Sequence, residues 1–221
     1  MGIMKANGLR IETPSEARGC RPGHEVGLLA DAVELKAGRK IAELGSGVGA
    51  LALTLAARVT VEVVGFEILP LLVEAARRNA ELNAGRLLGS VSFELADIRR
   101  VGGTRWEGRF DHVFANPPFY RVGQGRRSPR PERDVARHES QTTFEDFVRA
   151  AAILLCPPGR FHFIFRPERL EELLAVASRH HCPIKIVCPI YTRRSGNAEW
   201  VVVTGVKGGR AGLVISPPRT V

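Results

Sequence analysis

Residues 40–49 read Lys40-Ile41-Ala42-Glu43-Leu44-Gly45-Ser46-Gly47-Val48-Gly49, and this stretch indicates the fold. Residues 40–44 are typical of a short buried strand, and the residues that follow to position 58 are typical of a helix. The glycines between them lack a Cβ, so the backbone can approach a ligand closely there. The start of the helix adds unpaired N–H groups. A strand, a glycine turn and a helix in this order predict an α/β unit with a ligand at the turn.

Strand-like and helix-like segments alternate along most of the chain. We expect strands at residues 40–44, 61–66, 91–95, 110–115, 161–165, 184–190 and 200–206. We expect helices at residues 24–35, 50–58, 70–83, 143–155 and 170–177. Only a loop joins the last two strands, so they should form an antiparallel pair. The pattern predicts an α/β fold with a doubly wound, mostly parallel seven-stranded sheet that contains one antiparallel strand.

Length and composition narrow the class of protein. The chain has 221 residues, 44% of them hydrophobic, which is enough for the core of one large domain. Residues 1–22 lack a clear hydrophobic period, so we expect an N-terminal extension there and one domain over residues 23–221. The net charge of +9 fits a polyanionic partner such as nucleic acid, although an arginine-rich codon bias would give the same composition. The oligomeric state stays open.

Neither a membrane segment nor a metal site is expected. No run of 18 apolar residues occurs, and the first ten residues do not resemble a signal peptide, so we expect a cytoplasmic protein. The cysteines are Cys20, Cys156, Cys182 and Cys188, and none of them forms a Cys-x-x-Cys pair. Their spacing from His180 and His181 matches no standard zinc pattern.

Acidic residues stand at or beside the ends of three successive predicted strands. These residues are Glu43, Glu67 and Asp97. The carboxyl ends of parallel strands meet at one edge of a sheet, and an acid after the second strand can accept hydrogen bonds from ribose hydroxyls. Asp97 is the candidate acceptor for an adenine amino group, and Ile68 and Ile98 are candidates to pack on the two ring faces.

The acid beside the glycine turn favours one cofactor over another. A helix N-terminus alone attracts a pyrophosphate, as in NAD-binding turns. Glu43 beside the turn suits a cationic group better, such as the amino-acid portion of S-adenosylmethionine. The predicted cofactor site comprises Glu43, Gly45, Ser46, Gly47, Gly49, Glu67, Ile68, Asp97 and Ile98. The same glycines and Glu67 also satisfy the loose dinucleotide pattern, so an NAD oxidoreductase is an alternative. That alternative does not explain Asp97.

The sequence Asn116-Pro117-Pro118-Phe119 directly follows the predicted strand at residues 110–115. A planar amine such as the N6 group of adenine has a delocalised lone pair, which must be freed before the nitrogen can accept a methyl group. The Asn116 side-chain oxygen and the Pro117 carbonyl can accept its two N–H groups, and Phe119 can stack on the base. The sequence therefore predicts methylation of a planar amine, with Asn116, Pro117 and Phe119 as catalytic residues.

An arginine-rich segment follows this motif. Residues 121–137 hold six arginines against two acidic residues, next to the predicted pocket. We expect Arg126, Arg127 and Arg130 to contact RNA phosphates and Tyr120 to stack on the substrate base. The alternative is a solvated loop with no ligand. A looped-out adenine costs less to extract than a stacked duplex base, which favours an RNA loop as substrate.

These motifs resemble those of class I S-adenosylmethionine-dependent methyltransferases, in the branch with an Asn-Pro-Pro-aromatic signature. Within that branch the chain is most similar to bacterial tRNA adenine-N6 methyltransferases that modify an anticodon-loop adenine of valine tRNA. The resemblance covers residues 21–218 and rests on residues 43–49, 110–120, 136–139, 158–161 and 205–213.

The resemblance implies a Rossmann-like methyltransferase fold, S-adenosylmethionine bound by Glu43, Gly45, Gly47, Glu67 and Asp97, and a tRNA substrate. The family's helix before the first strand begins Thr-Asp-Ala, and here it reads His24-Glu25-Val26, so Glu25 is the candidate replacement for the aspartate. Residues 21–25 also resemble a motif of the glutamine methyltransferases that act on release factors. That activity is one alternative, and a non-catalytic RNA-binding module is another.

Overall fold

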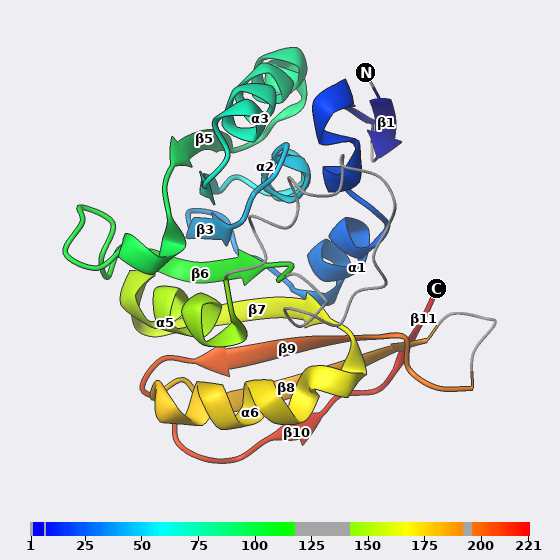
Figure 1. The fold of residues 1–221 in the computed structure, drawn as a ribbon. Coiled ribbons are helices and arrows are strands. Elements are labelled where there is room, and N and C mark those ends of the chain that lie inside the picture. Colours follow the sequence, from blue (N-terminus) through cyan, green and yellow to red (C-terminus); the bar gives the residue numbers. More distant parts are fainter. Residues whose placement is uncertain (1, 7, 118–141, 192–195) are drawn as a thin grey trace.

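The computed structural model describes residues 2–6, 8–117, 142–191 and 196–221. It contains a nine-stranded sheet with helices on both faces and a small two-stranded sheet near the N-terminus (Figure 1). Among the helices in these described ranges, none is long and apolar enough to cross a membrane.

The large sheet has the order β10-β8-β9-β7-β6-β3-β4-β5, and β11 also pairs with β8. Its strands are β3 (Lys40–Leu44), β4 (Glu62–Glu67), β5 (Ser90–Leu95), β6 (Phe110–Ala115), β7 (Leu155–Phe165), β8 (Ile184–Tyr191), β9 (Trp200–Val206), β10 (Val214–Ile215) and β11 (Arg219–Thr220). β9 pairs antiparallel with β7 and β8, whereas the other described pairings in this sheet are parallel. The predicted doubly wound sheet with one reversed strand is confirmed. The seven expected strands are present, and the two-residue strands β10 and β11 add to them.

Helices cover both faces of this sheet (Figure 1). The α-helices are α1 (Glu25–Ala32), α2 (Ala50–Arg58), α3 (Pro70–Asn83), α5 (Phe144–Leu154) and α6 (Leu170–Arg179). Short 3-10 helices are η1 (Ser15–Cys20), η2 (Ala84–Arg86), η3 (Ile98–Arg100) and η6 (Pro167–Arg169). Buried side chains from α1, α2 and α3 contribute to one core cluster, and those of α5 and α6 belong to another on the opposite face. Further buried side chains of α2 and α3 pack with Leu9 and Ile11 in a third cluster. The strands alternate between the two clusters, as a strand buried on both faces must.

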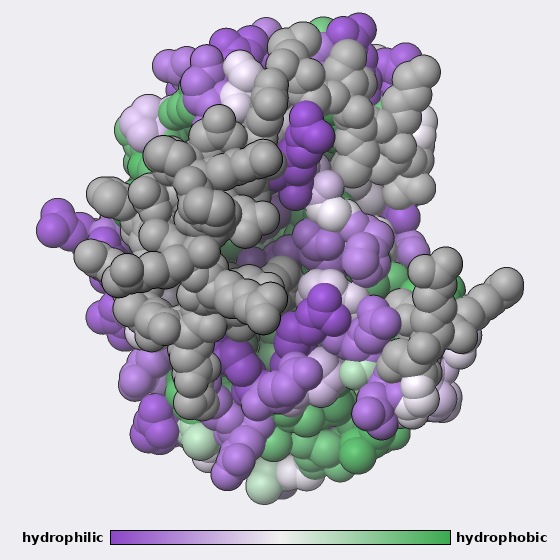
Figure 2. Space-filling view, turned by 45° about the vertical axis from the view of Figure 1, so that its right-hand side comes forward, coloured by the Kyte–Doolittle hydropathy of each residue, from purple (hydrophilic) through white to green (hydrophobic). Residues whose placement is uncertain are grey.

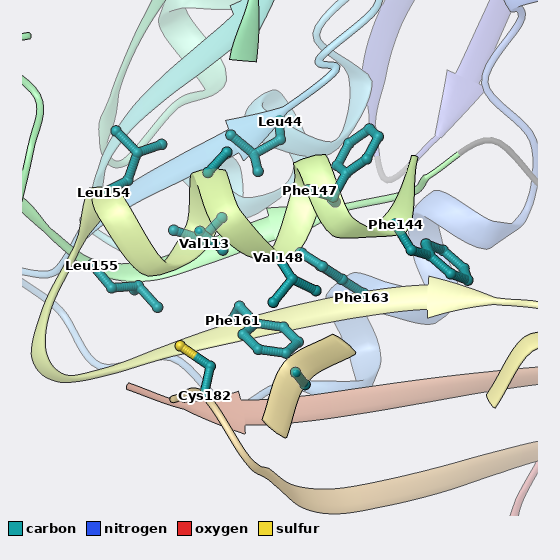
Figure 3. Packing of buried hydrophobic residues seen from close by; sticks show 14 of the residues in the cluster. Leu44, Val113, Phe144, Phe147, Val148, Leu154, Leu155, Phe161, Phe163 and Cys182 are labelled. Atoms are coloured by element: carbon teal, nitrogen blue, oxygen red, sulfur yellow. The ribbon is translucent and has the colours of Figure 1, made fainter. Parts of the chain in front are cut away.

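Aromatic side chains fill the core beneath α5. Phe161 and Phe163 of β7 lie under Phe147 and Val148 of α5, and the buried Cys182 lies at the end of this cluster (Figure 3). Thr143 caps α5 by accepting a hydrogen bond from the Asp146 amide, as expected for a helix N-cap. This packing fixes the carboxyl ends of β6 and β7.

Two elements differ in length from the sequence-based expectation. The helix expected at residues 24–35 ends at Ala32, because Val33 is extended with a φ of −122°. The strand expected at residues 161–165 begins at Leu155. Its pairing with β6 changes register in the stretch that contains Pro157 and Pro158, which have no amide hydrogen to donate to a neighbouring strand.

The segment predicted as an N-terminal extension holds more structure than its sequence indicates. β1 (Gly2–Ala6) and β2 (Leu9–Thr13) form an antiparallel hairpin. Asn79 of α3 accepts from the amide of Glu12 and donates to its carbonyl oxygen, and Asn83 does the same with Arg10. Both asparagines are fully buried. Their side chains satisfy backbone groups of β2 that a second neighbouring strand would otherwise pair with.

Hydrophilic side chains cover the centre of the described surface in a view turned toward the right-hand side of Figure 1 (Figure 2). In Figure 1 the arrowheads of β6 and β7 point to that side, where the carboxyl ends of the parallel strands meet. Hydrophobic residues gather at the lower end of the same view, near β10, where Val214 and Ile215 are exposed.

Candidate functional site

The pairing of the strands brings the predicted site residues to one edge of the sheet. Leu44 is aligned with Phe66 of β4 and with Ala115 of β6. The residues that follow these three are Gly45, Glu67 and Asn116, so the glycine turn lies between the acid and the carboxamide. The predicted convergence of the glycine turn, Glu67 and Asn116 at the carboxyl edge therefore follows directly from the register.

The glycine turn has a backbone conformation that requires glycine. Gly45, Gly47 and Gly49 have φ values of +68°, +55° and +82°, in the left-handed region that other residues avoid. The amides of Gly45 and Ser46 donate to the Phe66 carbonyl oxygen at 2.8 and 3.1 Å, which ties the turn to β4. The buried Ser46 hydroxyl has no hydrogen-bond partner within the described part of the chain.

Glu67 supports this turn from the end of β4. Its Oε2 accepts from the Gly47 amide at 2.8 Å, and its Oε1 accepts from the amides of Ile68 and Leu69 at 2.8 and 3.0 Å. Only 1% of the residue is exposed, and this burial raises the pKa of Glu67 against the lowering effect of the three hydrogen bonds. The acid predicted to bind ribose thus also fixes the glycine turn. A carboxylate has lone pairs for more than three donors, so both roles are compatible.

Glu43 is a buried carboxyl group beneath the start of α2. Its Oε2 accepts from the Ala52 amide at 3.0 Å, and the residue is 6% exposed. Burial raises the pKa of Glu43 to about 8, the charge of Glu67 adds to this effect, and the hydrogen bond from Ala52 opposes it. A carboxyl group held largely neutral at pH 7 becomes ionised more readily when a cation comes close. This environment fits the predicted contact with a cationic group.

Asp97 is paired with a neighbouring arginine and Ile98 is buried, neither of which the sequence predicts. Both oxygens of Asp97 accept hydrogen bonds from the Arg99 side chain at 2.7–3.0 Å, and these bonds lower the pKa of Asp97. Ile98 is 8% exposed and packs in the core, whereas Ile68 is 40% exposed. The predicted adenine contact thus has apolar surface available at Ile68 and little at Ile98. A cavity of about 470 Å³ beside Asp97 has none of the glycine-turn residues in its lining.

Asn116 is the predicted catalytic residue that the structure describes most fully. Its Oδ1 is buried and has no hydrogen-bond partner among the described residues. Its Nδ2 donates to Oε1 of Glu25 at 3.4 Å. The neighbouring Pro117 is buried as well. An unpaired buried acceptor costs about 1–3 kcal/mol, so a polar ligand at this position would be favoured.

The remaining predicted substrate residues lie outside the described residues. They are Phe119, Tyr120, Arg126, Arg127 and Arg130. On the described part of the same edge, the exposed Arg166 lies over the ring of Trp200 at 4.1 Å from its centroid. Trp200 also contacts His24 with ring centroids 5.6 Å apart. Sequence reasoning missed this stack because its members are far apart in the chain.

The acidic, histidine and cysteine side chains of the described residues are dispersed. Within them, no three His, Cys, Asp or Glu side chains are grouped closely enough to hold an ion. The four cysteines are free thiols, and Cys182 and Cys188 are buried.

Most of the chain matches a known protein family. Residues 24–175 match the model of the family described as "Methyltransferase small domain", which is more than half of the chain. The chain belongs to this family. The matched residues include the glycine turn, the three acids and Asn116.

Relatives and solved structures agree with this assignment. A protein of Phocaeicola vulgatus is 28% identical over 176 residues, which span 80% of this chain and 72% of the relative. A protein of Tolumonas auensis is 29% identical over 161 residues, which span 72% of this chain and 65% of the relative. Both are named tRNA1(Val) (adenine(37)-N6)-methyltransferase.

Two solved structures show the same fold. A predicted O-methyltransferase of Agrobacterium tumefaciens has a TM-score of 0.70 at 27% identity, covering 88% of this chain and 86% of that chain. A T. thermophilus 16S rRNA methyltransferase in complex with AdoMet and guanosine has a TM-score of 0.66 at 25% identity. That similarity covers 93% of this chain and 50% of the T. thermophilus chain.

Proposed function

We propose that this protein transfers a methyl group from S-adenosylmethionine to the exocyclic N6 amine of an adenine in tRNA. The single observation that carries the proposal is the buried Oδ1 of Asn116, which has no hydrogen-bond partner among the described residues and lies beside the glycine turn at the carboxyl edge of the sheet. The family assignment and the names of the relatives support the same activity. A tRNA substrate implies a cytoplasmic location.

The residues around the glycine turn fit the proposed cofactor. The turn presents backbone close to a ligand, Glu43 can become ionised beside an ammonium group, and Glu67 can accept from ribose hydroxyls. The Ser46 hydroxyl, which has no partner in the described part of the chain, is a further polar atom in the turn that a ligand can satisfy. When bound, S-adenosylmethionine supplies a methyl group activated by the positive charge on sulfur. The proposed cofactor contacts are Glu43, Gly45, Ser46, Gly47, Gly49, Glu67, Ile68, Asp97 and Ile98.

In the proposed reaction, the chain's own groups prepare the amine. Asn116 Oδ1 accepts one N–H of the adenine amine, and the Pro117 carbonyl accepts the other. Two acceptors on one side draw the nitrogen toward sp³ geometry and direct its lone pair to the opposite side, toward the methyl group. No strong base is needed, because the proton leaves after the nitrogen has become cationic. Alignment of this kind can contribute about 7–11 kcal/mol to lowering a barrier.

The basic character of the chain supports an RNA substrate. The net charge is +9, and six arginines in residues 121–137 follow the catalytic motif. We propose that Phe119 and Tyr120 stack on the base and that Arg126, Arg127 and Arg130 contact phosphates. At the described edge, Arg166 is held by Trp200 and by a hydrogen bond to the Glu199 carbonyl, which suits it to contact a backbone phosphate.

The test compares substrates directly. The purified protein is incubated with methyl-labelled S-adenosylmethionine and, in separate reactions, total tRNA, total protein including release factors, or DNA. The products are then digested to nucleosides or amino acids. We expect label in N6-methyladenosine from tRNA only. Label in methylated glutamine would replace this proposal by the glutamine methyltransferase alternative, and no label in any arm would refute methyl transfer to these substrates.

A further inference from the structure

Glu25 is the described side chain that contacts the carboxamide of Asn116. It is the first residue of α1, and its Oε1 accepts from Asn116 Nδ2 at 3.4 Å and from the Gly23 amide at 3.0 Å. The carboxylate folds back over Gly23, where a Cβ would collide with it. The two residues are 91 positions apart in the chain, so the contact exists only because α1 docks beside the end of β6.

The start of α1 is held firmly in this place. Leu28 and Leu29 bury their side chains in the core beneath the helix. His24, directly before Glu25, packs edge-on against Trp200 at the start of β9. A carboxylate on a packed helix keeps a fixed position, whereas a carboxylate on a solvated loop would not.

An asparagine side chain can face a substrate with either of two ends. Its amide has a donor and an acceptor, and rotation by 180° exchanges them with little change of shape. The proposed reaction requires the acceptor, Oδ1, to face the amine. An ionised carboxylate only accepts hydrogen bonds, so it pairs with Nδ2 and would repel Oδ1. The contact with Glu25 therefore selects the productive orientation of Asn116.

We infer that Glu25 is a positioning residue that holds Asn116 with its Oδ1 directed at the target amine. The inference rests on the proposed function for the identity of the amine, but the orientation of Asn116 can be measured without it. A negative charge beside Nδ2 also polarises the amide, which makes Oδ1 a stronger acceptor. In this role Glu25 acts through Asn116.

The first test removes the acceptor while keeping the size of the side chain. For Glu25→Leu we expect kcat for tRNA methylation to fall about 10- to 100-fold, as for other changes that misplace a reacting group. We expect KM for tRNA and the dissociation constant for S-adenosylmethionine to change less than about twofold, since neither reports on Asn116 orientation. Glu34→Leu is the matched control, because Glu34 is an exposed carboxylate just past α1. An unchanged kcat for Glu25→Leu would overturn the inference.

The second test exchanges the carboxylate and the carboxamide between positions 25 and 116. Asn116→Asp places two carboxylates against each other and should be strongly impaired by their repulsion. In the double variant Glu25→Gln with Asn116→Asp, the amide introduced at position 25 donates to the carboxylate introduced at position 116. That hydrogen bond leaves the second carboxylate oxygen free for the amine. We expect the double variant to be at least about tenfold more active than Asn116→Asp alone. Equal or lower activity would refute the positioning role.

The third readout does not depend on turnover. In protein labelled with ¹⁵N-asparagine, the NH₂ signal of Asn116 is identified by its loss in Asn116→Ala, among the five asparagines of the chain. In Glu25→Leu we expect this signal to move while the other asparagine signals stay in place. If the wild-type protein fails to methylate any RNA, the proposed function fails and this measurement still decides the inference. An Asn116 signal unaffected by Glu25→Leu would contradict it.

Discussion

The two halves of the sheet edge differ in how their polar side chains are paired. In the cofactor half, at the ends of β3, β4 and β5, the protein itself already donates hydrogen bonds to Glu43, Glu67 and Asp97. In the substrate half, between the end of β6 and the start of α1, Asn116 has only its donor end paired within the described residues.

The two halves are therefore prepared for their ligands in different ways. Glu67 fixes the backbone of the glycine turn and Glu43 accepts from an amide of α2, so the structural and the proposed binding roles of these two acids are combined. The Ser46 hydroxyl is the exception there, since it lacks a partner in the described part of the chain. The substrate half instead keeps a strong acceptor that has no partner in the ranges that the structure describes, which costs free energy until a donor arrives. Changes in the first half should therefore affect stability and cofactor binding, and changes in the second should affect turnover.

The largest expected effect comes from Asn116→Ala. Without Oδ1 the amine keeps its delocalised lone pair, and we expect kcat to fall by about 100- to 1,000-fold or more, the range seen when one oriented catalytic hydrogen-bonding group is removed. Binding of S-adenosylmethionine, measured by titration calorimetry, should stay within about twofold of the wild type. If calorimetry instead shows a loss of cofactor affinity to match the loss of rate, the separation of the two halves is wrong.

Gly49→Ala, a change in the cofactor half, should lower the free energy of unfolding. A Cβ there would be 2.5 Å from the Phe93 ring, and the residue would keep a φ of +82°. Strain of about 1–2 kcal/mol from the left-handed backbone and about 1–3 kcal/mol from overpacking predict a loss of about 2–5 kcal/mol in the free energy of unfolding. Urea unfolding measures this loss. Gly27→Ala is the control, because Gly27 lies within α1 with open space around it, and that change should stabilise by about 0.5–1 kcal/mol.

The features that the sequence predicted are those with local signals. The strands of the large sheet have short apolar runs, and the glycine turn and Asn116 are read from neighbouring residues. The features that it missed depend on distant partners. The hairpin of β1 and β2 docks through Asn79 and Asn83, which lie 67 and 73 positions away from Glu12 and Arg10. Two asparagines spaced four apart on the buried face of a helix are the signal that could have revealed this docking. Strands β10 and β11 are too short for any periodicity to show.

The smallest expected effect is a pH dependence that tests whether Glu43 is neutral in the folded cofactor half. Burial raises its pKa from 4.5 to about 8, so between these values the unfolded chain has released a proton that the folded chain keeps. The stability that this group contributes is present below pH 4.5 and is lost as the pH rises toward 8.

Glu43→Gln keeps the shape of the protonated acid and does not titrate. Between pH 6 and pH 7 the wild type should lose about 1 kcal/mol of unfolding free energy relative to Glu43→Gln, as measured by urea unfolding. Glu34→Gln, at an exposed position, should show no such change. If the difference in unfolding free energy between wild type and Glu43→Gln does not change with pH, Glu43 is already ionised without a ligand. The cofactor half would then carry an unneutralised buried charge.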